Sequence, residues 1–86
     1  SHPVAQAGHA DARAYHNLGL AFNKKGLWDE AIDAFRRSIE LDANDASARF
    51  NLGIVLNKKG LRDEAIAEYS EIVRQSPNYV PARLNL

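Results

Sequence analysis

The chain contains an internal repeat, in which the segment 12–45 returns as the segment 46–79. The two segments align without a gap, and fifteen positions carry the same residue in both. The clearest stretch is 23–32, which returns as 57–66. A fixed period of roughly 20 to 50 residues is typical of one supersecondary unit stacked on copies of itself, because a single unit cannot bury its own apolar face. We therefore expect a solenoid, whose functional surface is the face that the stacked units present.

Each repeat is predicted to form two helices. In the first repeat, apolar residues at three- to four-residue spacing indicate a helix that ends at Gly26, since glycine suits a left-handed cap. A second apolar stripe begins at Ala31 and stops at Asp42. The second repeat has the same pattern, with ends at Gly60 and Pro77. No segment alternates with period two, so the expected fold class is all-α, built from antiparallel helix hairpins.

The repeat also divides the chain. We assign residues 12–45 to the first repeat and residues 46–79 to the second. Residues 1–11 are interpreted as an N-terminal extension, left over from cloning or from a preceding repeat. Residues 80–86 echo the first helix of each unit, and we interpret them as the start of a third such helix, either truncated or capping.

These residues resemble the tetratricopeptide repeat (TPR) family, whose pattern places large, small and aromatic residues at fixed offsets. The first unit supplies Tyr15, Leu18, Gly19, Phe22, Ala31 and Phe35, and the second supplies Leu52, Gly53, Leu56, Ala65, Tyr69 and Pro77. The resemblance implies a right-handed α-solenoid, a fragment of a TPR superhelix. Arg49 departs from the pattern, because it stands where a large apolar residue is usual.

Two glycines within the predicted helices need a physical reason. Gly19 and Gly53 each cost about 1 kcal/mol of helix stability relative to Ala. We therefore expect a neighbouring helix to approach closely at both positions. The resemblance implies that Phe35 and Tyr69 fill the seam to the next unit.

The resemblance also implies that the first helix of each unit lines a concave groove that binds a peptide or a helix. The predicted groove residues are Arg13, His16, Asn17, Leu20, Asn23 and Lys24, then Ser47, Phe50, Asn51, Ile54, Asn57 and Lys58, and Asn85 from the third unit.

Three of these residues, Asn17, Asn51 and Asn85, occupy the same place in successive units and would form a ladder along the groove. An amide side chain offers a donor and an acceptor, so it can pair with any peptide backbone. The ladder is similar to one in the TPR superhelix of O-linked N-acetylglucosamine transferase, which holds extended peptides. An apolar strip of Leu20, Phe50, Ile54 and Leu84 would run beside it. The alternative is that the asparagines only solvate the groove or bond between adjacent helices.

A more specific kind of groove, the carboxylate clamp of chaperone-binding TPR domains, is not expected. The matching places in this chain are His16, Leu20, Asn51, Pro81 and Asn85. Only Asn51 has the residue type that the clamp needs. We therefore predict no carboxylate clamp for Hsp70 or Hsp90.

Composition and spacing argue against other activities. Eleven basic and eleven acidic residues cancel, so neither nucleic acid nor a membrane is an expected partner. His2, His9 and His16 would share a face only if a helix ran through Pro3 and Gly8, which we do not expect. No cofactor, no metal and no enzyme activity are therefore predicted. We expect a soluble protein, with the cytoplasm as the favoured compartment.

Three functions stay open. The leading hypothesis is a scaffold for protein–protein interaction that binds another protein or peptide in the groove. The second is self-assembly into a homo-oligomer through the open ends of the solenoid. The third is that the chain is the non-catalytic recognition arm of a larger enzyme.

Overall fold

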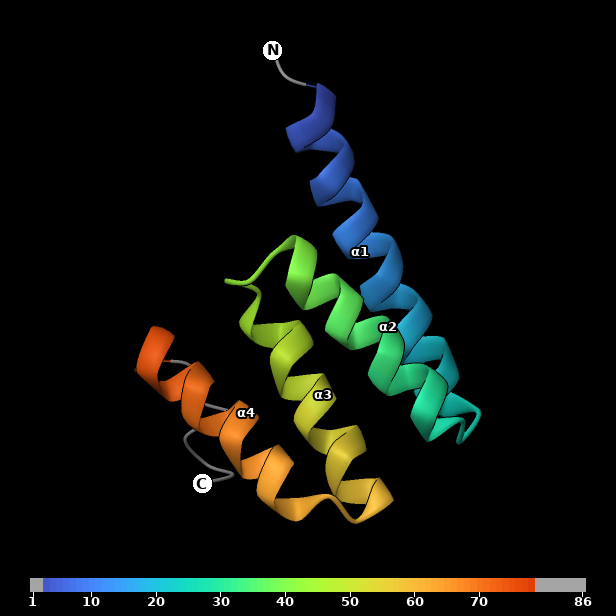
Figure 1. Cartoon of the computed structure of the whole chain (residues 1–86), viewed down its shortest axis with the longest axis vertical. Coiled ribbons are helices and arrows are strands. Elements are labelled where there is room, and N and C mark those ends of the chain that lie inside the picture. The colour runs from blue at the N-terminus through green and yellow to red at the C-terminus, as the bar shows by residue number, and fades with distance from the viewer. Residues whose placement is uncertain (1–2, 79–86) are drawn as a thin grey trace.

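The fold consists of two helix hairpins in sequence (Figure 1). In this computed structural model the backbone is described for residues 3–78 and the side chains for residues 8–78. The helices are α1 (Pro3–Lys24), α2 (Trp28–Leu41), α3 (Ala46–Lys59) and α4 (Arg62–Gln75). No strand occurs between residues 3 and 78. The predicted all-α fold of antiparallel hairpins is confirmed.

Local sequence signals account for most of the helix ends. Gly26 and Gly60 have positive φ angles of 78° and 91°, as expected for residues that end helices in the left-handed conformation. Asp45 caps the start of α3, where its carboxylate accepts a hydrogen bond from the Ala48 N–H at 3.1 Å. Pro77 follows α4 by two residues.

The start of α1 differs from the prediction. The expectation that Pro3 and Gly8 oppose a helix was wrong, because α1 begins at Pro3 and runs through Gly8. Proline suits the first position of a helix, where its missing N–H would have no partner. A glycine within a helix costs only about 1 kcal/mol, which a long helix tolerates. His9 and His16 therefore lie on one helix, and His2 lies outside the described residues.

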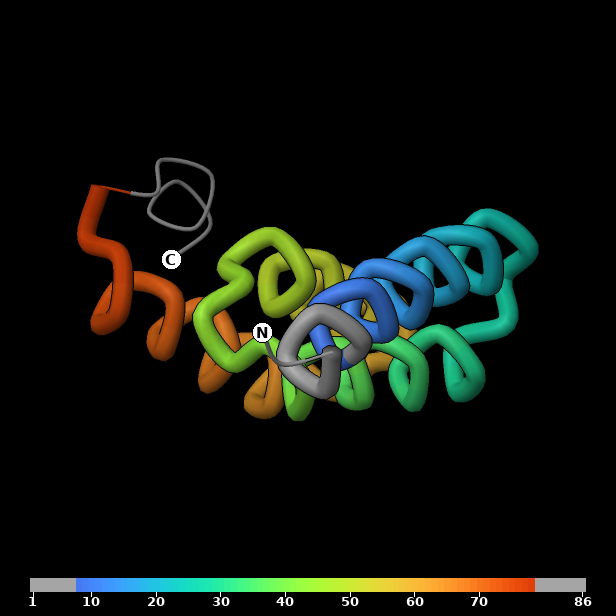
Figure 2. Tube along the Cα trace, turned by 90° about the horizontal axis from the view of Figure 1, so that it is seen from above, coloured from blue at the N-terminus to red at the C-terminus, as the bar shows by residue number. Residues whose placement is uncertain are grey.

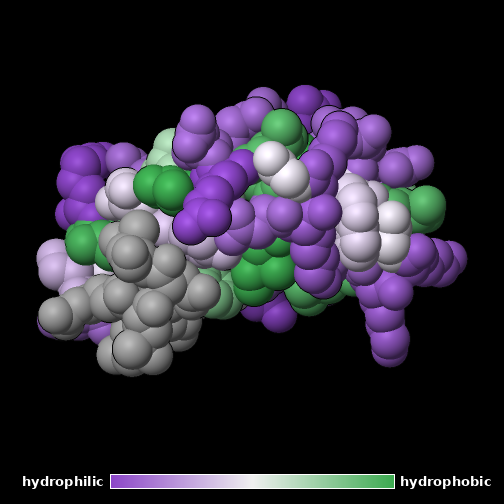
Figure 3. Space-filling view, turned by 90° about the horizontal axis from the view of Figure 1, so that it is seen from below, coloured by the Kyte–Doolittle hydropathy of each residue, from purple (hydrophilic) through white to green (hydrophobic). Residues whose placement is uncertain are grey.

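The four helices form two layers (Figure 2), with α1 and α3 in one layer and α2 and α4 in the other. Helix α1 packs on α2, α3 packs on α4, and α2 packs on α3, which joins the hairpins. The core spans this junction, and its largest fully buried apolar side chains are Phe35, Leu52, Val55, Leu56 and Ile72. Figure 3, seen from below, shows hydrophobic surface in separate areas among hydrophilic side chains.

The glycines within α1 and α3 are sites of close helix approach, as predicted. A Cβ atom on Gly19 would lie 2.6 Å from Cε1 of Phe35, and one on Gly53 would lie 2.6 Å from Cε1 of Tyr69. Each aromatic ring therefore sits directly on the glycine of its own hairpin. Phe35 also belongs to the core that joins the two hairpins.

Arg49 occupies a core position without breaking the packing. Its side chain is only 13% exposed, and its Nη1 lies 3.0 Å from Oε1 of Glu68. Its Nη2 donates to the Ala43 carbonyl oxygen at 3.1 Å. The guanidinium thus links α3 to α4 and to the turn that precedes α3.

Within the described residues, no helix has the length and apolar character to cross a bilayer.

Candidate functional site

The predicted groove residues lie on the layer formed by α1 and α3 (Figure 2). Asn85 is the exception, since it lies outside the described residues together with Leu84. The exposed members are Arg13, Asn17, Leu20, Lys24, Ser47, Asn57 and Lys58. The half-buried members are His16, Asn23, Phe50, Asn51 and Ile54.

Two hydrogen bonds connect α1 to α3 across this face. The Asn51 Nδ2 lies 3.2 Å from Nε2 of His16. The Lys58 Nζ donates to Oδ1 of Asn23 at 3.1 Å. Four of the predicted residues are therefore brought together in two pairs. At Asn51, the amide bonds between adjacent helices, as in the alternative interpretation of the ladder, whereas Asn17 stays exposed.

His16 is the most constrained side chain of the face. Its ring packs edge-on against Phe35 with centroids 5.8 Å apart. Its Nδ1 lies 3.5 Å from Oδ2 of Asp45. With the proton on Nδ1, Nε2 accepts from Asn51, so both ring nitrogens have a polar neighbour. Phe35, Asp45 and Asn51 together hold the ring in place.

A small polar cavity lies beside His16. It has a volume of about 250 Å³ and is lined by Arg13, His16, Asn17 and Asp45. Sequence reasoning named the first three residues and missed Asp45. The available signal was its position directly before α3, because Asp is a favoured residue at the N-cap of a helix.

The apolar strip is narrower than predicted. Leu20 is 41% exposed and Ile54 is half-buried, so both present apolar surface. Phe50 instead packs partly inward, with its ring centroid 5.7 Å from that of Tyr69. Burial raises the pKa of the Tyr69 phenol above its usual range, and a hydrogen bond with Asn57 partly opposes this shift.

Lys58 and Lys59, near the turn of the second hairpin, already have partners. The Lys58 ammonium lies 5.1 Å from the centroid of the Trp28 ring, in addition to its bond with Asn23. Lys59 forms an ion pair with Asp29. Lys24 and Arg13 are the other predicted groove cations, and both are exposed. No group of three metal-binding side chains occurs within the described part of the chain.

Comparisons with known proteins agree with this arrangement. A sequence model of the family described as "Tetratricopeptide repeat" matches residues 4–46 and residues 17–80. A crystal structure of MamA superposes with a TM-score of 0.81 at 35% identity, over 84% of this chain. A second MamA crystal structure gives 0.73 at 32% identity, over 77% of this chain.

The matches cover most of this chain but less than half of each MamA chain. The chain spans 42% of the first MamA chain and 36% of the second. No curated protein sequence matches the chain significantly. The family match extends over both hairpins, and the structural matches share their helical architecture. This chain therefore belongs to the tetratricopeptide repeat family and is a protein-interaction repeat module.

Proposed function

We propose that the face formed by α1 and α3 binds a segment of another protein, and that the chain acts by binding rather than by catalysis. The observation that carries the proposal is the juxtaposition of an exposed amide, Asn17, with an exposed apolar side chain, Leu20, beside a polar cavity. The amide would pair with a peptide backbone, and Leu20 would cover an apolar side chain of the ligand.

The fixed side chains of the face support the same proposal. His16 and Asn51 are already hydrogen-bonded, and Asp45 is fixed by its role as helix cap. Binding therefore orders few additional side chains, which lowers the entropic cost of association. Arg13 and Asp45 place charges of both signs at the cavity, which suits a polar or mixed-charge peptide.

The test begins with peptides selected from a random library displayed on phage, with the chain immobilised. The affinity of a selected, fluorescently labelled peptide is then measured by anisotropy. Asn17→Ala removes the exposed amide, and Leu20→Glu places a charge where apolar contact is expected. We expect each change to weaken binding by about tenfold, which corresponds to about 1.4 kcal/mol. Phe50 is left unchanged, because its substitution would also disturb its packing against Tyr69.

A matched control is available on the same helix. Leu18 is 43% exposed and Leu20 is 41% exposed, but Leu18 lies in the groove between α1 and α2. Leu18→Glu should therefore leave the affinity of the selected peptides unchanged. Equal affinities for the parent chain, Asn17→Ala and Leu20→Glu would contradict the proposal.

A further inference from the structure

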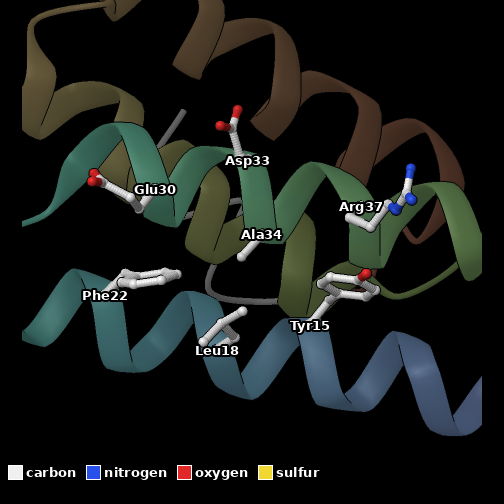
Figure 4. Close-up of a pocket in the computed structure, with 7 residues that line it drawn as sticks. All are labelled: Tyr15, Leu18, Phe22, Glu30, Asp33, Ala34 and Arg37. Atoms are coloured by element: carbon white, nitrogen blue, oxygen red, sulfur yellow. The ribbon is translucent and has the colours of Figure 1, made fainter.

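A second groove runs between α1 and α2, on a different side of the molecule from the face described above. Its volume is about 430 Å³. Its apolar floor is formed by Tyr15, Leu18, Phe22 and Ala34, and its rim carries Glu30, Asp33 and Arg37 (Figure 4). Helix α2 contacts the second hairpin through other residues, among them Arg36. Leu18 on the floor is therefore accessible while α2 packs on the second hairpin through another side.

The second repeat shows what covers such a surface. Leu18 and Phe22 occupy the places in the first repeat that Leu52 and Leu56 occupy in the second. Leu52 is 1% exposed and Leu56 is 0% exposed, because α2 packs against the second hairpin at this point. Leu18 is 43% exposed. The same position of the repeat is thus covered by an amphipathic helix in one unit and accessible in the other.

The charges on the rim determine which charge a helix docked in this groove must carry. In the second hairpin, Glu64 accepts a hydrogen bond from Arg36 of α2 at 3.1 Å. Glu30 is the equivalent of Glu64 in the first repeat, and it lies on the rim with Asp33. A helix that docks there would need a cation at the place that Arg36 holds in α2.

Residues 3–11, which precede the groove residues of α1 in the sequence, do not cover the groove. Helix α3 begins at Ala46 after its Asp45 cap, but the equivalent Asp11 lies within α1, which continues back to Pro3. Residues 3–11 therefore extend α1 instead of folding back over α2. Helix α4 of a second copy is a poorer occupant than an α2-like helix, because Ser70 stands where α2 has Arg36.

We propose that the α1–α2 groove docks an amphipathic helix of another protein, with apolar residues at i, i+3 and i+7 and Arg or Lys at i+4. This is the pattern of Ile32, Phe35, Ile39 and Arg36 in α2 itself. The apolar residues would cover Leu18 and Phe22, and the cation would pair with Glu30. This surface is separate from the α1–α3 face, so one chain would hold two different ligands.

The probe is a synthetic peptide with the sequence of Trp28–Leu41, in which a lactam between Asp33 and a lysine at position 37 holds the helix. These two positions line the groove with α1, and they lie at least about 100° around the helix axis from Ile32, Phe35 and Ile39, so the bridge leaves the apolar docking side free. Circular dichroism confirms that the peptide is helical before use. Titration into the isotopically labelled chain should shift the backbone amide signals of Tyr15, Leu18, Phe22 and Ala34.

Variants of the chain test the apolar contact and the ion pair separately. Leu18→Glu should weaken the peptide at least about tenfold. Glu30→Arg should weaken it to a similar degree, and a peptide that carries Arg36→Glu should restore the affinity. Leu20→Glu is the matched control and should leave the peptide affinity unchanged. Circular dichroism of each variant confirms that the chain still folds.

Several results would overturn the inference. These are no binding by the helical peptide, signal shifts centred on Asn17 and Asn51, or no rescue by the charge-reversed peptide. Self-association of the chain alone, abolished by Leu18→Glu, would also overturn it, because the occupant would then be a second copy. Shifts centred on Asn17 and Asn51 would place the peptide on the α1–α3 face, whereas the other results leave that face untouched, because its own test depends on Asn17 and Leu20.

Discussion

Gly19 and Gly53 determine how closely the two helices of each hairpin approach. At Gly53, an added Cβ would lie 2.6 Å from Cε1 and 2.8 Å from Cζ of Tyr69. Such distances require the ring to move, but Tyr69 is buried in the core and contacts Phe50. The absence of a side chain at this position is therefore a packing requirement.

Gly53→Ala should destabilise the chain, although alanine is the better helix former by about 1 kcal/mol. Forcing a methyl group into a filled site typically costs about 1 to 3 kcal/mol. We expect a net loss of up to about 2 kcal/mol in the free energy of unfolding, measured by urea denaturation and circular dichroism.

Gly8 provides the control within the same class of substitution. It also lies within a helix, but an added Cβ would meet nothing within 4 Å. Gly8→Ala should raise the free energy of unfolding by up to about 1 kcal/mol. If both alanine variants shift stability in the same direction, steric crowding at Gly53 is not the reason for the glycine.

The sequence predicts which positions need a close neighbour, but it predicts less well which residue that neighbour is. The cost of Gly19 and Gly53 predicts a close neighbour, and the structure confirms one. The partner of Arg49 is Glu68, which lies 19 residues away on another helix, and no local pattern connects them. The bond between His16 and Asn51 was similarly hidden, because it depends on how far one hairpin is rotated against the next.

At the scale of elements, α1 is the helix that departs from the repeat. It has 22 residues, whereas the other three helices have 14. Asp11 corresponds to the Asp45 cap, but it lies inside α1 and is exposed. Asp11 is therefore the counterpart of the carboxylate that caps α3, but it does not cap α1.

Removal of residues 1–10 should give Asp11 that role. The shortened chain should retain the two hairpins, because His9 and Ala10 are exposed and Ala12 is the first buried residue among the described side chains of α1. In the shortened chain Asp11→Ala should lower the free energy of unfolding by about 1 kcal/mol, the usual value of an N-cap side chain. Thermal unfolding followed by circular dichroism measures the difference.

The same substitution in the full chain is the control. There Asp11 lies within the helix, so Asp11→Ala should change stability little or raise it slightly, since alanine is the better helix former. A loss of equal size in both chains would mean that Asp11 stabilises α1 by another route than capping.

Helix ends are predictable where one residue type controls them. Gly26, Gly60 and Pro77 mark three of the ends, because each has a backbone preference that ends a helix. The beginning of α1 was not predicted, because proline disfavours helix interiors but suits the first position. The pattern alone does not say which position Pro3 occupies.

Across the whole molecule, burial of the helices follows their order in the stack. Helix α2 packs on both α1 and α3, and α3 packs on both α2 and α4, whereas α1 and α4 each have one major neighbour among the described helices. We expect amide hydrogen exchange, followed by NMR, to be slowest in the middle of α2 and α3. Exchange should be fastest in the first turns of α1.

The distribution of exchange rates would also show whether the hairpins unfold together. The shared core of Phe35, Leu52 and Ile72 predicts that Gly53→Ala speeds exchange in α2 as well as in α3. An effect confined to α3 and α4 would mean that each hairpin opens independently. Protection in the first turns of α1 equal to that in α2 would contradict the packing order.

The repeat in the sequence was sufficient to predict two stacked helix hairpins, since a fixed period requires stacked units. It could not distinguish covered from accessible copies of the same position. Leu18 and Leu52 occupy equivalent places, yet their exposures are 43% and 1%. This difference depends on which position another helix covers among the described residues, and it defines the second groove.

The junction between the hairpins has bonds on both of its sides. The His16–Asn51 bond crosses it in the layer of α1 and α3, and the Arg36–Glu64 bond crosses it in the layer of α2 and α4. A ligand that wedges one side apart must compress the other. In an array of such units, a small tilt at each junction adds up to a change in pitch. The resistance of such an array to bending would thus depend on the few side chains that bond across each junction.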